Sequence, residues 1–252
     1  MLLRGIIYSS LLIGLLVGLL LTGMQSVVVN PIIFASEAYE TEEVAPVAAA
    51  PHAHDHGAHE HNDEAWAPAD GAERLFYTAL ANVIASIGFA AVLLALMSQT
   101  QLQGWTSSSL GKGVLWGLAG FIAFFAAPGI GLPPEIPGIE AAPLDNRQGW
   151  WALTVVMFVV GMGLLAFAPL KLKAVSLVFF ALPYVIGAPH GAGPEFTGDA
   201  ASVAALTDLH STFIMASGIT NLVFWLVLGA FSAWCVNRWV LKGASGHAVA
   251  HG

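Results

Sequence analysis

Charged residues are scarce in this sequence, where Asp, Glu, Lys and Arg make up only 10% of 252 residues. A soluble domain normally carries about a quarter charged residues. The single cysteine, Cys235, excludes an internal disulfide and a thiolate metal cluster within one chain. The net charge of −8 argues against nucleic acid as a partner. These deficits indicate that lipid, rather than water, surrounds most of the chain.

Several catalytic signatures are also missing from the sequence. It has no GxxxxGK[ST] phosphate loop, no HExxH, no GxSxG and no CxxC. The usual signatures of an ATPase, a zinc protease, a serine hydrolase and a thiol redox enzyme are therefore absent. We expect no enzymatic activity, and any energy for transport must come from a partner or an ion gradient.

Long apolar runs are what the sequence does have, since 57% of its residues are hydrophobic. A helix needs about 20 apolar residues to span the hydrocarbon core. Six runs approach this length without the period-2 alternation of a barrel strand: 6–29, 75–97, 112–131, 150–168, 172–188 and 211–234. The sequence therefore predicts an all-α integral membrane protein, a polytopic bundle of about six transmembrane helices. Five transmembrane helices are the alternative, because the run 172–188 is short and contains Pro183.

The runs divide the chain into four parts. Residues 1–29 form the first transmembrane helix, an anchor whose apolar stretch is too long for a cleaved signal peptide. Residues 30–74 form an acidic, histidine-rich outer loop, and residues 75–240 a five-helix bundle with outer loops at 132–149 and 189–210. Residues 241–252 form a cytoplasmic tail.

The distribution of charge supports six passages and sets an orientation. With six spans, six of the eight basic residues lie on the side of the termini, and all sixteen acidic residues lie on the other side. Basic residues concentrate in cytoplasmic loops, so the N-terminus is predicted to be cytoplasmic. Removing the fifth span would move Arg238 and Lys242 outside, which breaks this pattern.

Small residues recur every four positions in two of the predicted helices, as Ser10, Gly14 and Gly18 in the first and Gly113 and Gly117 in the third. Such spacing lets helix backbones approach closely. We expect these residues to pack helices within one chain rather than to form a dimer interface.

The outer loop contains the strongest chemical signal, in the stretch PHAHDHGAHEHNDE. Its five histidines are His52, His54, His56, His59 and His61. Neutral imidazole binds Co, Ni, Cu and Zn, and nearby carboxylates can complete a coordination shell. The tract predicts a binding site for a divalent transition metal, while an inert acidic loop is the alternative. Affinity alone would not favour cobalt over nickel or zinc.

Two further histidines are predicted at helix ends on the same side, His190 in LPYVIGAPHG and His210 in TDLHSTFIM. We expect them to be metal ligands that receive the ion from the loop. Polar stripes then enter the membrane, with Asn82 and Ser86 on the second helix and Ser217 and Asn221 on the sixth. Polar residues in hydrocarbon need a partner or a role. They are either hydrogen-bond contacts between helices or part of an ion pathway.

The sequence resembles the CbtA family of predicted cobalt transporter subunits. The resemblance covers MLLRGIIYSSLLIGLLVGLL, the histidine-rich loop, DNRQGWWALT, LPYVIGAPHG and LHSTFIMASGITNLVFWLVLGAFSAW. It implies a protein of the bacterial cytoplasmic (inner) membrane that imports cobalt for cobalamin synthesis. It also implies a small single-helix, histidine-rich companion subunit of the CbtB type. Members are usually described with five spans.

The sequence thus predicts a subunit of a divalent metal importer that captures its ion on the outer loop. Imidazole binds metal when neutral, so capture should be lost on protonation near a pKa of about 6.5. The alternative is a membrane subunit that senses or chaperones metal without transporting it. A haem-bearing redox subunit is less favoured, because it would need histidines paired within facing helices.

Overall fold

The computed structural model describes residues 2–43, 68–107 and 109–241, and most of these residues are helical, with no strand among them. Its helices are as follows: α1 Leu2–Met24, η1 Gln25–Val29, α2 Asn30–Glu43, α3 Ala72–Leu102, α4 Leu110–Phe121, η2 Ile122–Ala126, α5 Ala127–Gly131, α6 Leu144–Phe167, α7 Leu170–Lys173, α8 Ser176–Ile186, α9 Ala200–Cys235 and η3 Val236–Val240. The segments named η are π-helices, with wider turns than an α-helix.

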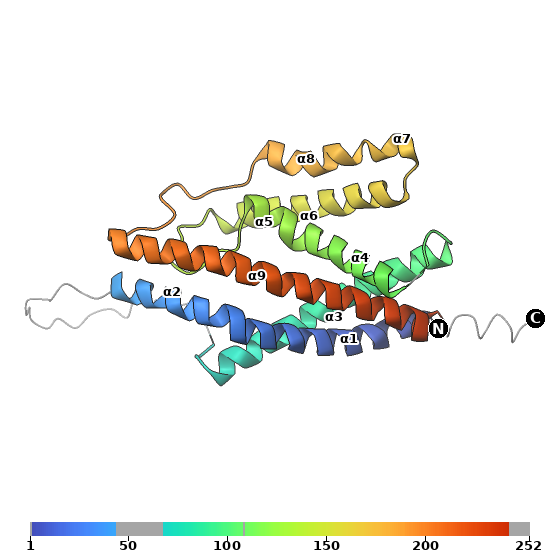
Figure 1. Ribbon diagram of the computed structural model, residues 1–252, viewed down its shortest axis with the longest axis horizontal. Helices are drawn as coiled ribbons and strands as arrows, with labels where there is room; N and C mark the ends of the chain where they lie inside the picture. The colour runs from blue at the N-terminus through green and yellow to red at the C-terminus, as the bar shows by residue number, and fades with distance from the viewer. Residues whose placement is uncertain (1, 44–67, 108, 242–252) are drawn as a thin grey trace, which may run out of the picture.

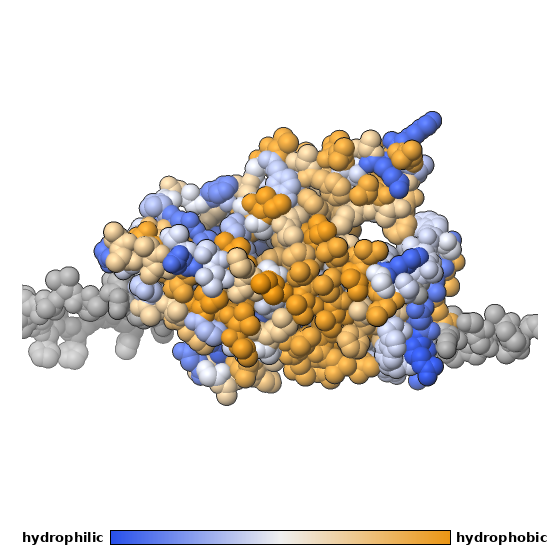
Figure 2. Space-filling view, in the orientation of Figure 1, coloured by the Kyte–Doolittle hydropathy of each residue, from blue (hydrophilic) through white to orange (hydrophobic). Residues whose placement is uncertain are grey.

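Five helices in the described part of the chain are long and apolar enough to span a membrane: Leu2–Tyr39, Ala72–Leu102, Leu110–Gly131, Leu144–Phe167 and Ala200–Val240. They lie roughly along one direction (Figure 1). In the space-filling view, hydrophobic residues dominate the middle of the visible face, with hydrophilic residues toward both ends (Figure 2). This arrangement confirms an all-α, polytopic membrane protein.

The run 172–188 is the exception among the predicted spans. It forms the four-residue α7 and the eleven-residue α8, which is shorter than the roughly 20 residues that a full helical span needs. Gly187, with a φ of 87°, ends α8, and the chain continues without regular structure toward α9. Nevertheless α8 runs back alongside α6, so α6 and α9 point in the same direction (Figure 1).

The bundle has two distinct ends. Gly5 packs against Val240, so the start of α1 and the end of η3 lie together at what we call the terminal end. The opposite, loop end holds α2, the starts of α3, α6 and α9, and the connections 132–143 and 187–199.

Several predicted boundaries differ from the observed ones at the loop end. The first helix continues past Val29 through η1 into α2, where a loop was expected from residue 30. Pro31 would clash with a carbonyl of the preceding turn in a regular α-helix. The wider π-turn, closed by the Asn30 N–H bonding the Gln25 carbonyl, comes immediately before Pro31 and moves that turn aside. The last span likewise begins at Ala200, where Asp199 caps α9, rather than at Ser211.

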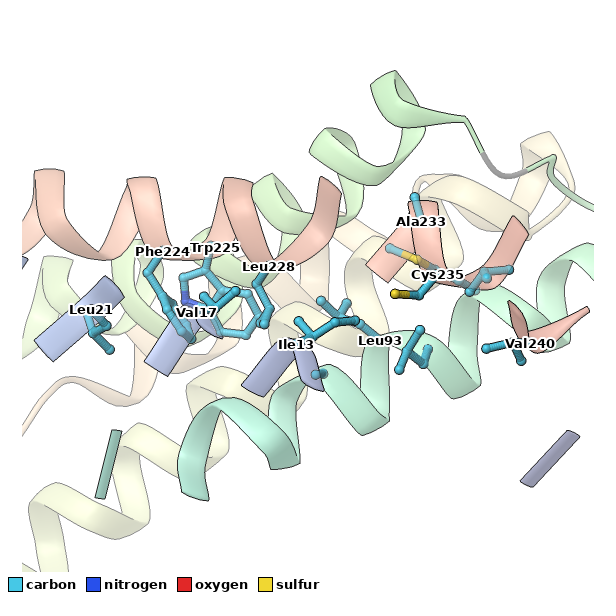
Figure 3. Packing of buried hydrophobic residues seen from close by; sticks show 14 residues of the cluster. Ile13, Val17, Leu21, Leu93, Phe224, Trp225, Leu228, Ala233, Cys235 and Val240 are labelled. Carbon is cyan, nitrogen blue, oxygen red and sulfur yellow. The ribbon is translucent and has the colours of Figure 1, made fainter. Parts of the chain in front are cut away.

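The main core lies between α1, α3 and α9 (Figure 3). Ile13, Val17 and Leu21 of α1 meet Leu94 of α3 and Leu228 of α9. The predicted glycine packing is confirmed within the chain. A Cβ at Gly18 would lie 2.6 Å from the Val83 Cα on α3, and one at Gly113 would lie 2.6 Å from the Gly229 carbonyl oxygen on α9.

A second, smaller core occupies the loop end. It joins Val29 of η1, Ile136 and Phe196 of the two connections, and Leu206 and Phe213 of α9. Polar residues lie between this loop-end core and the main core.

Candidate functional site

A polar cavity of about 310 Å³ lies between the two cores. It is open on one side and is bordered by the η1 and α2 segment, the start of α3 and the middle of α9. Ten residues line it: Gln25, Val29, Asn30, Ile33, Arg74, Thr78, Phe213, Ser217, Thr220 and Asn221. Seven of these carry polar or charged side chains, which is unusual for the interior of a membrane bundle.

One of the two predicted polar stripes lines this cavity, and the other approaches it. Ser217 and Asn221 of α9 line it directly, and Asn82 of α3 lies one turn beyond Thr78, which also lines it. Asn82 donates its amide to the Gln25 side-chain oxygen at 2.7 Å and to the Thr22 hydroxyl at 3.1 Å. Asn82 therefore joins α3 to α1 and η1, and it also positions a residue of the cavity wall.

The other stripe residues bond within their own helices. The Ser86 hydroxyl, fully buried, donates to the Asn82 carbonyl at 2.6 Å. Asn221 donates its amide to the Ser217 carbonyl at 3.0 Å. Ser86 is thus a buried packing residue, whereas Asn221 remains at the cavity surface.

An ion pair borders the cavity at the loop end. Arg74 of α3 donates from Nη2 to the Glu37 Oε1 of α2 at 2.7 Å, and from Nη1 to the Asp70 Oδ1 at 3.1 Å. The guanidinium carbon also lies 4.9 Å from the centroid of the Phe34 ring. The pair links α2 to α3 beside the cavity.

Thr220 presents an unsatisfied oxygen at the cavity wall. Its side chain is 1% exposed, and its hydroxyl has no hydrogen-bond partner among the described residues. A buried hydroxyl without a partner costs free energy, because burial removes its bonds to water. This oxygen is itself buried, so a ligand in the cavity could reach it only after a local rearrangement.

His210 is held between two connections at the loop end. Its Nε2 lies 3.0 Å from the Pro134 carbonyl oxygen, and its Nδ1 pairs with the Glu195 carboxylate. Both ring nitrogens are therefore directed at these two neighbours rather than at the cavity. His210 lies one helical turn before Phe213, which lines the cavity.

The other predicted metal ligands are separate from His210. His190 is exposed in the connection that follows α8. The tract His52, His54, His56, His59 and His61 lies outside the described residues. Within residues 2–43, 68–107 and 109–241, no three His, Cys, Asp or Glu side chains are grouped closely enough to hold a metal ion.

Several cavity residues were not singled out from the sequence. Gln25 and Asn30 are polar interruptions at the end of the first apolar run, and this could have marked them. Thr220 gives no comparable signal, because threonine is common in membrane helices. The partnership of Glu37 with Arg74 could not be inferred either, since it depends on how α2 lies against α3.

Spanning helices with a polar cavity between them define a multi-pass membrane protein. The chain belongs to the CbtA family, whose description is probable cobalt transporter subunit, and the match covers residues 3–237. No curated protein and no solved structure matches the chain. The chain is thus a subunit of a probable cobalt transporter.

Proposed function

We propose that this subunit imports divalent cobalt, capturing it on the histidine tract and passing it through the polar cavity. The observation that carries the proposal is a polar cavity between the helices, lined by Ser217 and Asn221 and approached by Asn82. Asn82 is a hydrogen-bond contact between helices, and by fixing Gln25 it also belongs to the proposed pathway. Segment 44–67, which contains the tract, joins the two helices that Arg74 and Glu37 link beside this cavity.

The acidic loop end suits the capture of a cation. All sixteen acidic residues are assigned to this side, against two basic residues, Arg74 and Arg147. Each of those two is paired with a carboxylate, Arg74 with Glu37 and Arg147 with Glu135. The field of the loop end therefore favours cations and raises their local concentration.

His190 and His210 are the proposed intermediates in the transfer. His190 is exposed and needs no rearrangement to bind a metal ion. His210 must first release Glu195 or Pro134, because both ring nitrogens are engaged. Ser217 and Asn221 would then contact the ion in the cavity, while Ser86 supports the pathway through Asn82.

The loop end is proposed to face outward across a bacterial cytoplasmic membrane, with both termini inside. The support is the concentration of basic residues at the terminal end. Single cysteines at Lys171 and Gly193, introduced with Cys235→Ser, test this orientation. A membrane-impermeant maleimide added outside intact cells should label the Gly193→Cys variant and leave Lys171→Cys unlabelled, and the reverse pattern would overturn it.

The imported cobalt is proposed to supply cobalamin synthesis, with nickel and zinc as competing ions. A small single-helix, histidine-rich companion of the CbtB type is the proposed partner, beside the lipid bilayer. Transport would be non-enzymatic, and the companion or an ion gradient would provide the energy.

Uptake of radiolabelled cobalt tests this function. Membrane vesicles would contain this subunit with or without the companion, and nickel and zinc would be added as competitors. Changing the five tract histidines to alanine should lower uptake at submicromolar cobalt, whereas changing His247 and His251 of the tail should not. Cobalt binding without uptake in any vesicle would instead favour a sensor or a metal chaperone.

A further inference from the structure

We propose that the surface where α4 begins and α6 ends binds an anionic phospholipid, with Lys112 and Lys171 holding the phosphate of its headgroup. This surface, which we call the lipid surface, also includes the rings of Trp105, Trp116 and Phe167. It lies at the terminal end of the bundle, whereas the polar cavity lies toward the loop end. The inference therefore does not depend on the proposed transport function.

The terminal end contains basic residues without any acidic ones. Its basic residues in the described part of the chain are Arg4, Lys112, Lys171, Lys173 and Arg238. Asp and Glu are absent from residues 1–36, 74–134, 146–194 and 209–252, which together include this whole end. The ion pairs among the described residues all lie at the loop end. An anion at the terminal end would therefore meet no opposing carboxylate.

The two lysines of the lipid surface have hydrogen-bond donors to spare. The Lys171 ammonium has no hydrogen-bond or ion-pair partner in the described part of the chain. The Lys112 ammonium donates to the Ser107 hydroxyl at 2.9 Å. An ammonium has three donors, so both lysines can still bind a phosphate group.

Three aromatic rings bring the two lysines to the same surface. Phe167, the last residue of α6, has its ring centroid 5.6 Å from that of Trp105 and 6.4 Å from that of Trp116. Lys112 precedes Trp116 by one turn of α4, and Lys171 follows Phe167 by four residues, in α7. The rings therefore join the two parts of the chain that carry the cations.

Apolar side chains remain exposed beside these cations. Trp105 is 59% exposed, and Leu115 on α4 is 62% exposed. Leu115 lies two residues from both Gly113 and Gly117, which pack against α9, so its side chain points away from α9. A soluble anion would leave this apolar surface uncovered, whereas the acyl chains of a phospholipid would cover it.

The lipid surface lies where two spanning helices end. The span Leu110–Gly131 begins two residues before Lys112, and the span Leu144–Phe167 ends four residues before Lys171. Lipid headgroups lie at this level, because the hydrocarbon layer ends with the apolar span. Indole rings also prefer this interface. Cations and indoles at the headgroup level favour a phospholipid over a soluble acidic protein.

Titration of phosphatidylglycerol into the purified full chain in a neutral detergent tests the site, with bound lipid measured by native mass spectrometry. Lys112→Gln combined with Lys171→Gln should lower the affinity about 25-fold, since each basic residue near an anionic lipid contributes about fivefold. The control is Arg4→Gln combined with Arg238→Gln, which removes two cations from the same end but from α1 and η3 (Figure 1). Affinity should be unchanged in this control. Equal losses in the two double variants would show a general effect of charge and overturn the inference.

A single substitution keeps the test decisive if the double variant does not fold. Lys171 is exposed and has no partner in the described residues, so Lys171→Gln should not change thermal unfolding without lipid. It should still lower the affinity for phosphatidylglycerol about fivefold. Unchanged affinity in this variant would exclude Lys171 from the site and overturn the inference.

Competition with the wild type distinguishes a phospholipid from other anions. Glycerol 3-phosphate has the phosphate group without acyl chains, and an oligoglutamate peptide has negative charge without phosphate. Neither should displace phosphatidylglycerol at equal concentration. Displacement by glycerol 3-phosphate would assign the surface to free phosphates, and displacement by the peptide would assign it to an acidic protein. Phosphatidylcholine, which has no net charge, should bind more weakly than phosphatidylglycerol, and equal binding of the two lipids would also overturn the inference.

Discussion

Asn82 of α3 and Gln25 of η1 are joined by a 2.7 Å hydrogen bond between their side-chain amides. The same Asn82 nitrogen donates to Thr22 at 3.1 Å, so one side chain connects two helices and a wall of the cavity. A residue that binds helices together can thus also shape a solute site, and the two interpretations of the polar stripe are compatible.

Asn82→Ala should destabilise the bundle by about 1 kcal/mol, because two hydrogen bonds between helices in a membrane contribute roughly 0.6 kcal/mol each. Unfolding in mixed micelles measures the change. Asn221→Ala is the matched control, since its amide nitrogen bonds the Ser217 carbonyl of its own helix. Equal destabilisation by the two variants would argue against a connecting role for Asn82.

Gly117→Ala should destabilise the protein by about 1–3 kcal/mol, because the added methyl group would overlap the Trp225 carbonyl oxygen on α9. Gly111→Ala, on the same helix α4 but in open space, should leave stability unchanged or raise it by up to about 1 kcal/mol. The free energies of unfolding of both variants provide the comparison. A stable Gly117→Ala protein would mean that α4 and α9 are not in close contact.

His210→Ala should release the two connections that His210 holds through Pro134 and Glu195. Hydrogen exchange should become faster in 132–143 and 187–199, because these contacts no longer hold the two connections against α9. His190→Ala, at an exposed position, should not change exchange in 132–143. Unchanged exchange in His210→Ala would leave metal binding as the remaining role for this histidine.

The start of α9 should depend on pH through Asp199. The Ser202 hydroxyl, followed by the N–H groups of Ser202 and Ala201, donates to this carboxylate and lowers its pKa below the ordinary 3.8. Because the folded pKa is the lower one, the cap is fully stabilising above pH 3.8 and is lost as pH falls through the lowered value. Protection of the Ala201 and Ser202 amides, corrected for intrinsic exchange, should therefore decrease only below pH 3.8.

Asp199→Asn is the control for that pH dependence. Asparagine is also a good N-cap residue but does not titrate in this range. Its protection should be independent of pH between about 7 and 3. The same decrease in both proteins would assign the transition to a different group.

The spans and their glycine contacts were predictable because both depend on local pattern. An apolar run of sufficient length becomes a helix in lipid, and Gly14 and Gly18 mark a face that can approach another helix. The positions of Asn82 and Asn221 in polar stripes follow from helical periodicity in the same way.

The cavity itself was not predictable, because it depends on which helices are neighbours. Periodicity places Ser217 and Thr78 on helix faces, but not opposite each other. The π-turn before Pro31 moves Asn30 and Ile33 into the wall, and no residue pattern signals such a turn reliably. The shortness of α8 was not predictable either, since the run 172–188 is divided into α7 and α8 and Gly187 ends α8.

The two cores should respond to different solvents. Leu2–Tyr39 has 38 residues and is about 57 Å long at 1.5 Å per residue, whereas the hydrocarbon layer is about 30 Å thick. With the main core in that layer, the loop-end core of Val29, Ile136, Phe196, Leu206 and Phe213 extends toward water. Urea and cooling weaken hydrophobic contacts that form because apolar surface leaves water. The loop-end core, next to water, depends on such contacts, whereas the main core is surrounded by lipid. The loop-end core should therefore open under conditions that leave the main core intact.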